Sequence, residues 1–303
     1  MLWITWRQHR TALLSTLAAT VLISALMLWL WQGVAELNDA CAQHDCITGV
    51  AGALGARVSY VYTALNLLQP VLGGLIAVFW GAPLLAREYE QHTNLLVWSQ
   101  DVTPLRWIGS KVVLLGSAAV LLSAGLAAAS WQLVEAMGVA GNTFGMDGFR
   151  ALDLWPPVQV LYTLFGFVLG LATGLVVRRT VLALGATLVV FALVRAVIAN
   201  TLLQWLEPTR MLTAPTDDWP LPSGSYSVGT VYLDAAGQEM APIRGCYDTK
   251  CMVEHGAHTL SLTYQPVERL ATFQWMEVIA YALLTLVAAG VAWTLVRRAT
   301  RVS

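Results

Sequence analysis

The stretch VLALGATLVVFALVRAVIANTLL, from Val181 to Leu203, holds a single charged side chain, Arg195, in an otherwise largely apolar run. About 20 such residues are enough for an α-helix to cross the roughly 30 Å hydrocarbon core of a bilayer. Five other runs of similar character occur. They extend approximately from Ala12 to Val34, Val58 to Leu85, Trp107 to Met137, Val158 to Val177 and Phe273 to Val296. The sequence therefore predicts six transmembrane helices.

The composition of the whole chain excludes an ordinary soluble protein. Hydrophobic side chains make up 57% of its 303 residues, charged side chains 12%, and the mean hydropathy is +0.63. Soluble domains have about 45–50% apolar and about 25% charged residues. We therefore expect an all-α polytopic membrane protein whose surroundings are the lipid bilayer, with no nucleic-acid partner.

Basic residues indicate the orientation of the six helices, because cytoplasmic loops carry an excess of Lys and Arg. They gather before the first run, between the second and third, between the fourth and fifth, and after the sixth. The two short loops on the other side hold only Arg57 and Arg150. This asymmetry predicts that both termini lie in the cytoplasm.

The predicted organisation has three parts. Residues 1–203 form helices 1–5, residues 204–272 form a small extracytoplasmic domain, and residues 273–303 form helix 6 with a basic cytoplasmic tail. The middle part is rich in proline, and its stretch SYSVGTVYLDAAGQEM, residues 225–240, predicts a strand, a turn and a second strand.

Four cysteines occur in two identical spacings, and the predicted topology places all of them on the oxidising side of the membrane. This placement favours disulfides, and the sequence leaves the pairing open. A metal site built from one cysteine pair and two nearby histidines is the alternative, although its spacing fits the common zinc patterns poorly. The residues concerned are Cys41, Cys46, Cys246, Cys251, His255 and His258.

A charged segment, LLAREYEQHTNLLVWSQD, from Leu84 to Asp101, follows the second apolar run. Residues 86–98 contain no Gly or Pro, and we expect them to form a short cytoplasmic helix. A solvated turn between two spans is the alternative, but a turn needs fewer residues. A short charged helix at this position indicates a docking surface for another protein.

The longer stretch LLAREYEQHTNLLVWSQDVTPLRWIGSKVV, from Leu84 to Val113, resembles the region after the second span in permeases of the ABC type-2 transporter family. REYEQHT, TPLRW and GSK carry the match, and YQPVERLATFQWMEVIAYALL before the last span resembles an actinobacterial subgroup. His92 departs from the family pattern, which often has Gly there. The resemblance implies a multi-pass protein of the bacterial cytoplasmic membrane.

The resemblance also implies a coupling helix, at about residues 86–98, that docks on a separate ATP-binding subunit. The contact residues would be Arg87, Glu88, Glu90 and Thr93, with Arg106 and Lys111 at the adjoining membrane edge. Reversing both glutamates to lysine is expected to leave folding intact and to uncouple the ATPase. The chain has no G-x-x-x-x-G-K-[ST] motif, so it is not expected to be an enzyme, and ATP and Mg²⁺ would bind the partner.

Small residues within the spans predict close helix packing. Gly166, Gly170 and Gly174 form a small-x-x-x-small face, which suits packing inside one subunit or between two subunits. Pro70 and Gly73 would bend or loosen the second span next to the charged segment. On the resemblance, this part of the span borders a translocation path.

Arg195 is costly inside a span unless it pairs, faces water or reaches the headgroups. It is a candidate for the translocation path, or it snorkels toward Glu207 or the headgroups. Glu135, near the outer end of the third span, is either a partner of Arg195 or an interfacial carboxylate. We therefore expect the permease subunit of an ABC exporter, a homodimer with two ATP-binding subunits, that effluxes an amphipathic drug, antibiotic, lipid or hydrophobic peptide. The alternative is a membrane sensor that relays an external signal to a cytoplasmic partner.

Overall fold

The structure is a computed structural model, and it describes residues 2–43, 60, 71–91, 104–136, 149, 152–215, 221–222, 224–246 and 248–301. Within these ranges six helices are long and apolar enough to cross a membrane. They are Leu13–Gly33, Val71–Glu90, Leu105–Glu135, Pro156–Val177, Thr180–Gln204 and Val267–Arg298. The prediction of a helical membrane protein with six spans is confirmed.

The helices that carry these spans follow the chain order of the apolar runs. They are α1 (Leu2–Gln43), the π-helix η1 (Ala77–Gly81) with α3 (Ala82–Glu90), α5 (Pro104–Ala136), α7 (Pro156–Val177), α8 (Thr180–Thr201) and α10 (Leu270–Arg301). Proline opens α5 and α7, where its missing N–H costs no helical hydrogen bond. Arg178 ends α7 in the left-handed conformation, and α8 begins two residues later.

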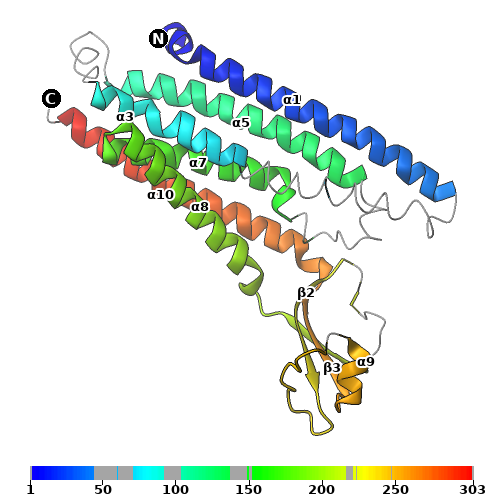
Figure 1. Cartoon of the computed structure of the whole chain (residues 1–303). Coiled ribbons are helices and arrows are strands. Elements are labelled where there is room, and N and C mark those ends of the chain that lie inside the picture. The colour runs from blue at the N-terminus through cyan, green and yellow to red at the C-terminus, as the bar shows by residue number, and fades with distance from the viewer. Residues whose placement is uncertain are drawn as a thin grey trace. The chain divides into compact units, whose positions relative to one another are not determined.

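The spans belong to one compact unit, made of Met1–Ala140, Asp153–Ala199 and Gln274–Ser303. Within it α1 packs along α5, and α5 packs on α7 (Figure 1). A cluster of buried aromatic rings, Tyr162, Phe165, Phe191 and Tyr281, joins α7 to α8 and α10. The ring stacks fix these three helices against one another more specifically than apolar contact alone would.

The second span and α7 approach each other through glycine. A Cβ on Gly170 would lie 2.7 Å from Ala82 N and 2.9 Å from Gly81 C, and one on Gly174 would lie 2.5 Å from Ala82 O. Gly166 faces Ala77 and Gly73 in the same way. The structure thus places the three glycines of α7 against the second span of the same chain, at the π-helix η1.

The second compact unit comprises Gly141–Leu152 and Asn200–Phe273. It contains an antiparallel sheet in the order β1-β3-β2, formed by Thr209–Thr213, Thr259–Gln265 and Tyr226–Leu233, and the short helix α9 (Thr249–Glu254). The predicted first strand is β2, and Asp234 accepts the turn N–H groups of Ala236 and Gln238.

The predicted second strand of this hairpin is wrong, because the residues after the turn form only the isolated bridge between Leu233 and Glu239. Pro242 follows at once and lacks the N–H that a longer ladder needs. The partner of β2 is instead β3, distant in sequence. The predicted domain limits, 204–272, stay a prediction.

Candidate functional site

The charged segment after the second span begins inside a helix that continues that span. Helical residues run without a break from 71 through η1 and α3 to Glu90, and Gln91 lies in a turn. The sequence predicted a separate helix at 86–98. In the structure residues 86–90 are instead the last turn of the second span. Thr93 and the other residues between 92 and 103 lie outside the described residues.

Glu88 joins α3 to the start of α5. Its carboxylate forms an ion pair with the ammonium of Lys111, whose side chain is only 3% exposed. The same ammonium lies 4.5 Å from the centre of the Trp107 ring, where a cation–π interaction is favourable. The aromatic ring and the carboxylate together compensate for the burial of the lysine charge.

Glu90 joins α3 to the start of α8. Its Oε2 accepts a hydrogen bond of 2.9 Å from the backbone N–H of Thr180, the first residue of α8. An acidic side chain at a helix N-terminus also interacts favourably with the helix dipole. Next to it, the Arg178 guanidinium lies 5.1 Å from the centre of the Tyr89 ring.

The residues predicted to contact an ATP-binding subunit therefore fall into two groups. Glu88 and Glu90 are engaged with α5 and α8 of this chain, and Lys111 is the buried partner of Glu88. Arg87 and Arg106 are exposed. We define the elbow cluster as Glu88, Glu90, Lys111 and Thr180, the residues that tie the end of α3 to the beginnings of α5 and α8.

A second group of charges surrounds Arg195 of α8. Its Nη2 lies 2.6 Å from Asp153 Oδ2, in the 3-10 helix η2 (Leu152–Leu154), and its Nη1 lies 2.8 Å from Glu277 Oε1, in α10. Nη1 also donates to the Tyr281 hydroxyl at 3.3 Å, and the guanidinium lies 5.3 Å from the centre of the Tyr162 ring. We call these five residues the arginine network.

The partners expected for Arg195 from the sequence, Glu207 and Glu135, are wrong. Glu135 accepts a hydrogen bond from Trp131 of its own helix, and the backbone carbonyl of Glu207 accepts one from Arg269. The sequence reading missed Glu277, although a carboxylate inside the last apolar run is as unusual as Arg195 and could have been paired with it. Asp153 gave no comparable signal, because it lies outside the apolar runs.

Gly73 and Arg195, two candidates for a translocation path, are brought to the same aromatic side chain. A Cβ on Gly73 would lie 2.8 Å from Tyr162 Cδ2, while Arg195 lies over the Tyr162 ring. Pro70, the third candidate, lies outside the described residues.

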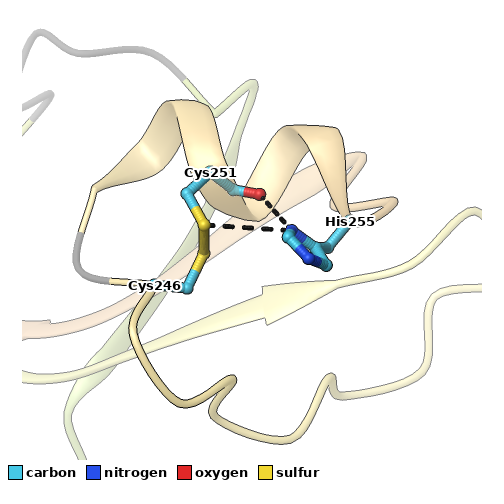
Figure 2. Close-up of side chains that lie close together, drawn as sticks. All are labelled: Cys246, Cys251 and His255. Carbon is cyan, nitrogen blue, oxygen red and sulfur yellow. Dashed lines mark hydrogen bonds between the residues drawn. A yellow bond between two sulfur atoms is a disulfide. The ribbon is translucent and has the colours of Figure 1, made fainter.

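In the second unit, Cys246 and Cys251 form a disulfide beside His255 (Figure 2). The imidazole Nδ1 lies 2.8 Å from the backbone oxygen of Cys251 and 3.8 Å from its sulfur. The three side chains are close enough together to hold a metal ion, but sulfurs bonded to each other are not the thiolates that bind metals. The pairing is local, within one C-x4-C spacing.

Among the described residues the group of possible metal ligands consists of Cys246, Cys251 and His255. Cys46 lies outside the described residues, and for Cys41 only the helical backbone of α1 is described. His258 donates its backbone N–H to Leu233.

Comparison with known proteins identifies the chain through its membrane-spanning part. The family described as "ABC-2 membrane transporter related" matches residues 17–203, which extend from within the first span almost to the end of the fifth and include the elbow cluster. A comparison with curated protein sequences gave no match. The match covers more than half of the chain and agrees with the resemblance carried by the charged segment. The chain is a multi-pass membrane protein that belongs to the ABC-2 transporter permease family.

Proposed function

We propose that the chain is the permease subunit of an ATP-driven ABC exporter in the bacterial cytoplasmic membrane, working as a homodimer with two ATP-binding subunits. Membrane components of this family are in general associated with an ATP-binding subunit. The chain itself has no phosphate-binding G-x-x-x-x-G-K-[ST] motif. Hydrolysis of ATP, with Mg²⁺, is therefore assigned to the partner.

The elbow cluster is the observation that carries this proposal. A subunit that docks after Glu90 would push on the end of α3, and Glu88 and Glu90 would pass the movement to α5 and α8. The buried pair of Glu88 and Lys111 makes this joint stiff, because separating its charges inside the protein is unfavourable.

The structure favours a division of roles among the predicted contact residues. Glu88 and Glu90 hold the joint together from inside the chain, whereas the exposed Arg87 and Arg106 are available to an acidic surface of the partner. Thr93 remains a predicted contact. With both termini in the cytoplasm, all of these residues lie on the side where ATP is found.

An amphipathic cargo is supported by the distribution of charge. In the described spans the charged side chains lie near the span ends, apart from Lys111, Arg195 and Glu277. Each of these three is paired within the chain. Such a membrane domain offers apolar surface with few charges, which suits a drug, an antibiotic, a lipid or a hydrophobic peptide better than an ion or a sugar.

The test is affinity purification of the tagged full-length chain in mild detergent, with mass spectrometry of the bound proteins and an ATPase assay. We expect a stoichiometric ATP-binding subunit and ATP hydrolysis. The double variant Arg87→Glu with Arg106→Glu should lose most of the bound subunit and of the ATPase activity. Arg244→Glu, at an exposed arginine of the second unit, is the matched control and should lose neither.

Two results would contradict the proposal. A purified chain without an ATP-binding subunit and without ATPase activity would favour the sensor alternative, in which the second unit receives an external signal. Equal amounts of bound subunit in the double variant and the control would show that the two exposed arginines do not form the docking surface.

A further inference from the structure

The arginine network holds more negative than positive charge. Arg195 brings one guanidinium to two carboxyl groups, Asp153 at 2.6 Å and Glu277 at 2.8 Å. The other two members, Tyr162 and Tyr281, are neutral phenols that face the same guanidinium. With both carboxyls ionised, the network would carry a net charge of −1.

The Glu277 end of the network lies away from water. The Glu277 side chain is 0% exposed and that of Arg195 is 13% exposed. Four elements pack around the group, namely η2, α7, α8 and α10, and among the described residues the titratable groups that face Glu277 are those of the network itself. An uncompensated charge in such a place is strongly unfavourable.

Within the described part of the chain, one carboxylate oxygen of Glu277 has no partner that would stabilise its negative charge. Oε1 accepts from Arg195, whereas Oε2 is buried and has no hydrogen-bond donor among the described residues. The carboxyl groups of Asp153 and Glu277 also converge on one guanidinium, the first at Nη2 and the second at Nη1. Two ionised carboxylates can only accept hydrogen bonds, so their proximity is repulsive unless one of them carries a proton.

We propose that Asp153 and Glu277 form a proton-binding site, in which the two carboxyls share one proton held against Arg195. The proton sits on the oxygen pair formed by Glu277 Oε2 and the Asp153 carboxyl. It converts their repulsion into a hydrogen bond, gives Oε2 its missing partner and makes the network neutral. Two carboxyl groups held beside a single guanidinium repel each other unless a second positive charge joins them.

A proton fits this place better than a metal ion or an organic cation. Oε2 is buried, and the neighbouring carboxylate oxygens, Glu277 Oε1 and Asp153 Oδ2, are already engaged by the Arg195 guanidinium. A metal such as Ca²⁺ needs six to eight oxygen ligands, and Mg²⁺ an octahedral set. Asp153, whose side chain is 35% exposed, provides the route by which a proton enters and leaves.

The test is infrared spectroscopy of the full-length protein in lipid nanodiscs at neutral pH, read at the C=O stretch of protonated carboxylic acids. We expect this band in the wild type and its loss in Glu277→Gln, because an amide has no such band. Asp153→Asn should lose it as well, since Glu277 would then ionise beside Arg195 as a balanced pair. Glu135→Gln, which changes a carboxylate outside the network, is the control and should keep the band.

Each variant gives a decisive result. A wild type without the band would overturn the proposal, and would be the result if a metal ion or an ammonium group held the two carboxyls together. A band that persists in Asp153→Asn would show that Glu277 is neutral by burial alone and shares no proton. Glu277→Gln and Asp153→Asn each leave one carboxylate beside the Arg195 guanidinium, which is a balanced ion pair. Failure of both variants to fold would therefore contradict the charge balance proposed for the network.

Discussion

Replacing Gly170 by alanine tests the contact between α7 and the second span. The new Cβ would lie 2.7 Å from Ala82 N and 2.9 Å from Gly81 C, and it would also meet the carbonyl oxygen of Ala77. Ordinary contacts are 3.4–4 Å, so Ala82 N, at 2.7 Å, would have to move by at least 0.7 Å, and the closer carbonyl oxygen of Ala77 by more. Because all three neighbours are backbone atoms, no side-chain rotation relieves the clash.

The expected magnitude follows from two opposing terms. Overpacking of a tight interior costs about 1–3 kcal/mol, and a clash with backbone on the facing helix belongs at the upper end. Alanine recovers about 0.5–1 kcal/mol over glycine inside a helix. We therefore expect Gly170→Ala to lower the free energy of unfolding by about 2 kcal/mol.

Gly185 of α8 provides the matched control, because a Cβ there meets nothing within 4 Å. Gly185→Ala should stabilise by about 0.5–1 kcal/mol through helix propensity alone. The assay is reversible unfolding of the detergent-solubilised protein by SDS, followed by circular dichroism. If Gly170→Ala unfolds at the same SDS fraction as Gly185→Ala, the close approach of the two helices is refuted.

Two further predictions concern the charged joint and the disulfide. Glu88→Lys places a second positive charge beside the Lys111 ammonium, whose side chain is 3% exposed. It should destabilise the protein by about 3–5 kcal/mol, because breaking a buried pair leaves an uncompensated charge. Glu88→Gln should cost clearly less in the same SDS titration, and equal losses would argue against an electrostatic cause. Cys246→Ser removes the disulfide to Cys251 and should lower the free energy of unfolding of the second unit by about 2 kcal/mol. The measurement is thermal unfolding with and without reductant. A difference between variant and wild type that persists under reducing conditions would not come from the disulfide.

The prediction for Glu88 shows where the sequence reading of the charged segment was incomplete. From the sequence, reversing Glu88 and Glu90 is expected to leave folding intact, because charges beside a span look solvated. In the structure both carboxylates bind groups of other helices. Nothing in the local sequence indicates that Lys111 is buried, since its surroundings are created by packing between α3 and α5.

The six spans could be predicted because membrane insertion depends on a local property. A run of about 20 apolar residues is a spanning helix whatever its neighbours are, since the bilayer requires every backbone polar group to be satisfied within the segment. The boundaries were less accurate at the second span, where helical structure continues to Glu90 through charged residues. The ion pair of Glu88 with Lys111 and the hydrogen bond of Glu90 with Thr180 hold these residues against other helices.

The arginine network could be predicted only in part. The cost of a charge inside a span made Arg195 conspicuous and required a partner, and the same argument applied to Glu277 would have joined the two. Asp153 and Tyr162 carry no such signal, because an acidic residue before a helix and a tyrosine within one are both common. Their roles depend on which helix faces meet.

Composition and local spacing were enough to predict six runs that can span a membrane, the charged segment after the second of them, and the resemblance of that segment to ABC type-2 permeases. These features depend on composition and on short spacings, which act locally. Three other features are set by tertiary contacts: β2 pairs with β3, the glycines of α7 lie against the second span, and Asp153 and Glu277 meet at Arg195. Such contacts join residues far apart in the chain, and their energies depend on geometry that no single segment contains.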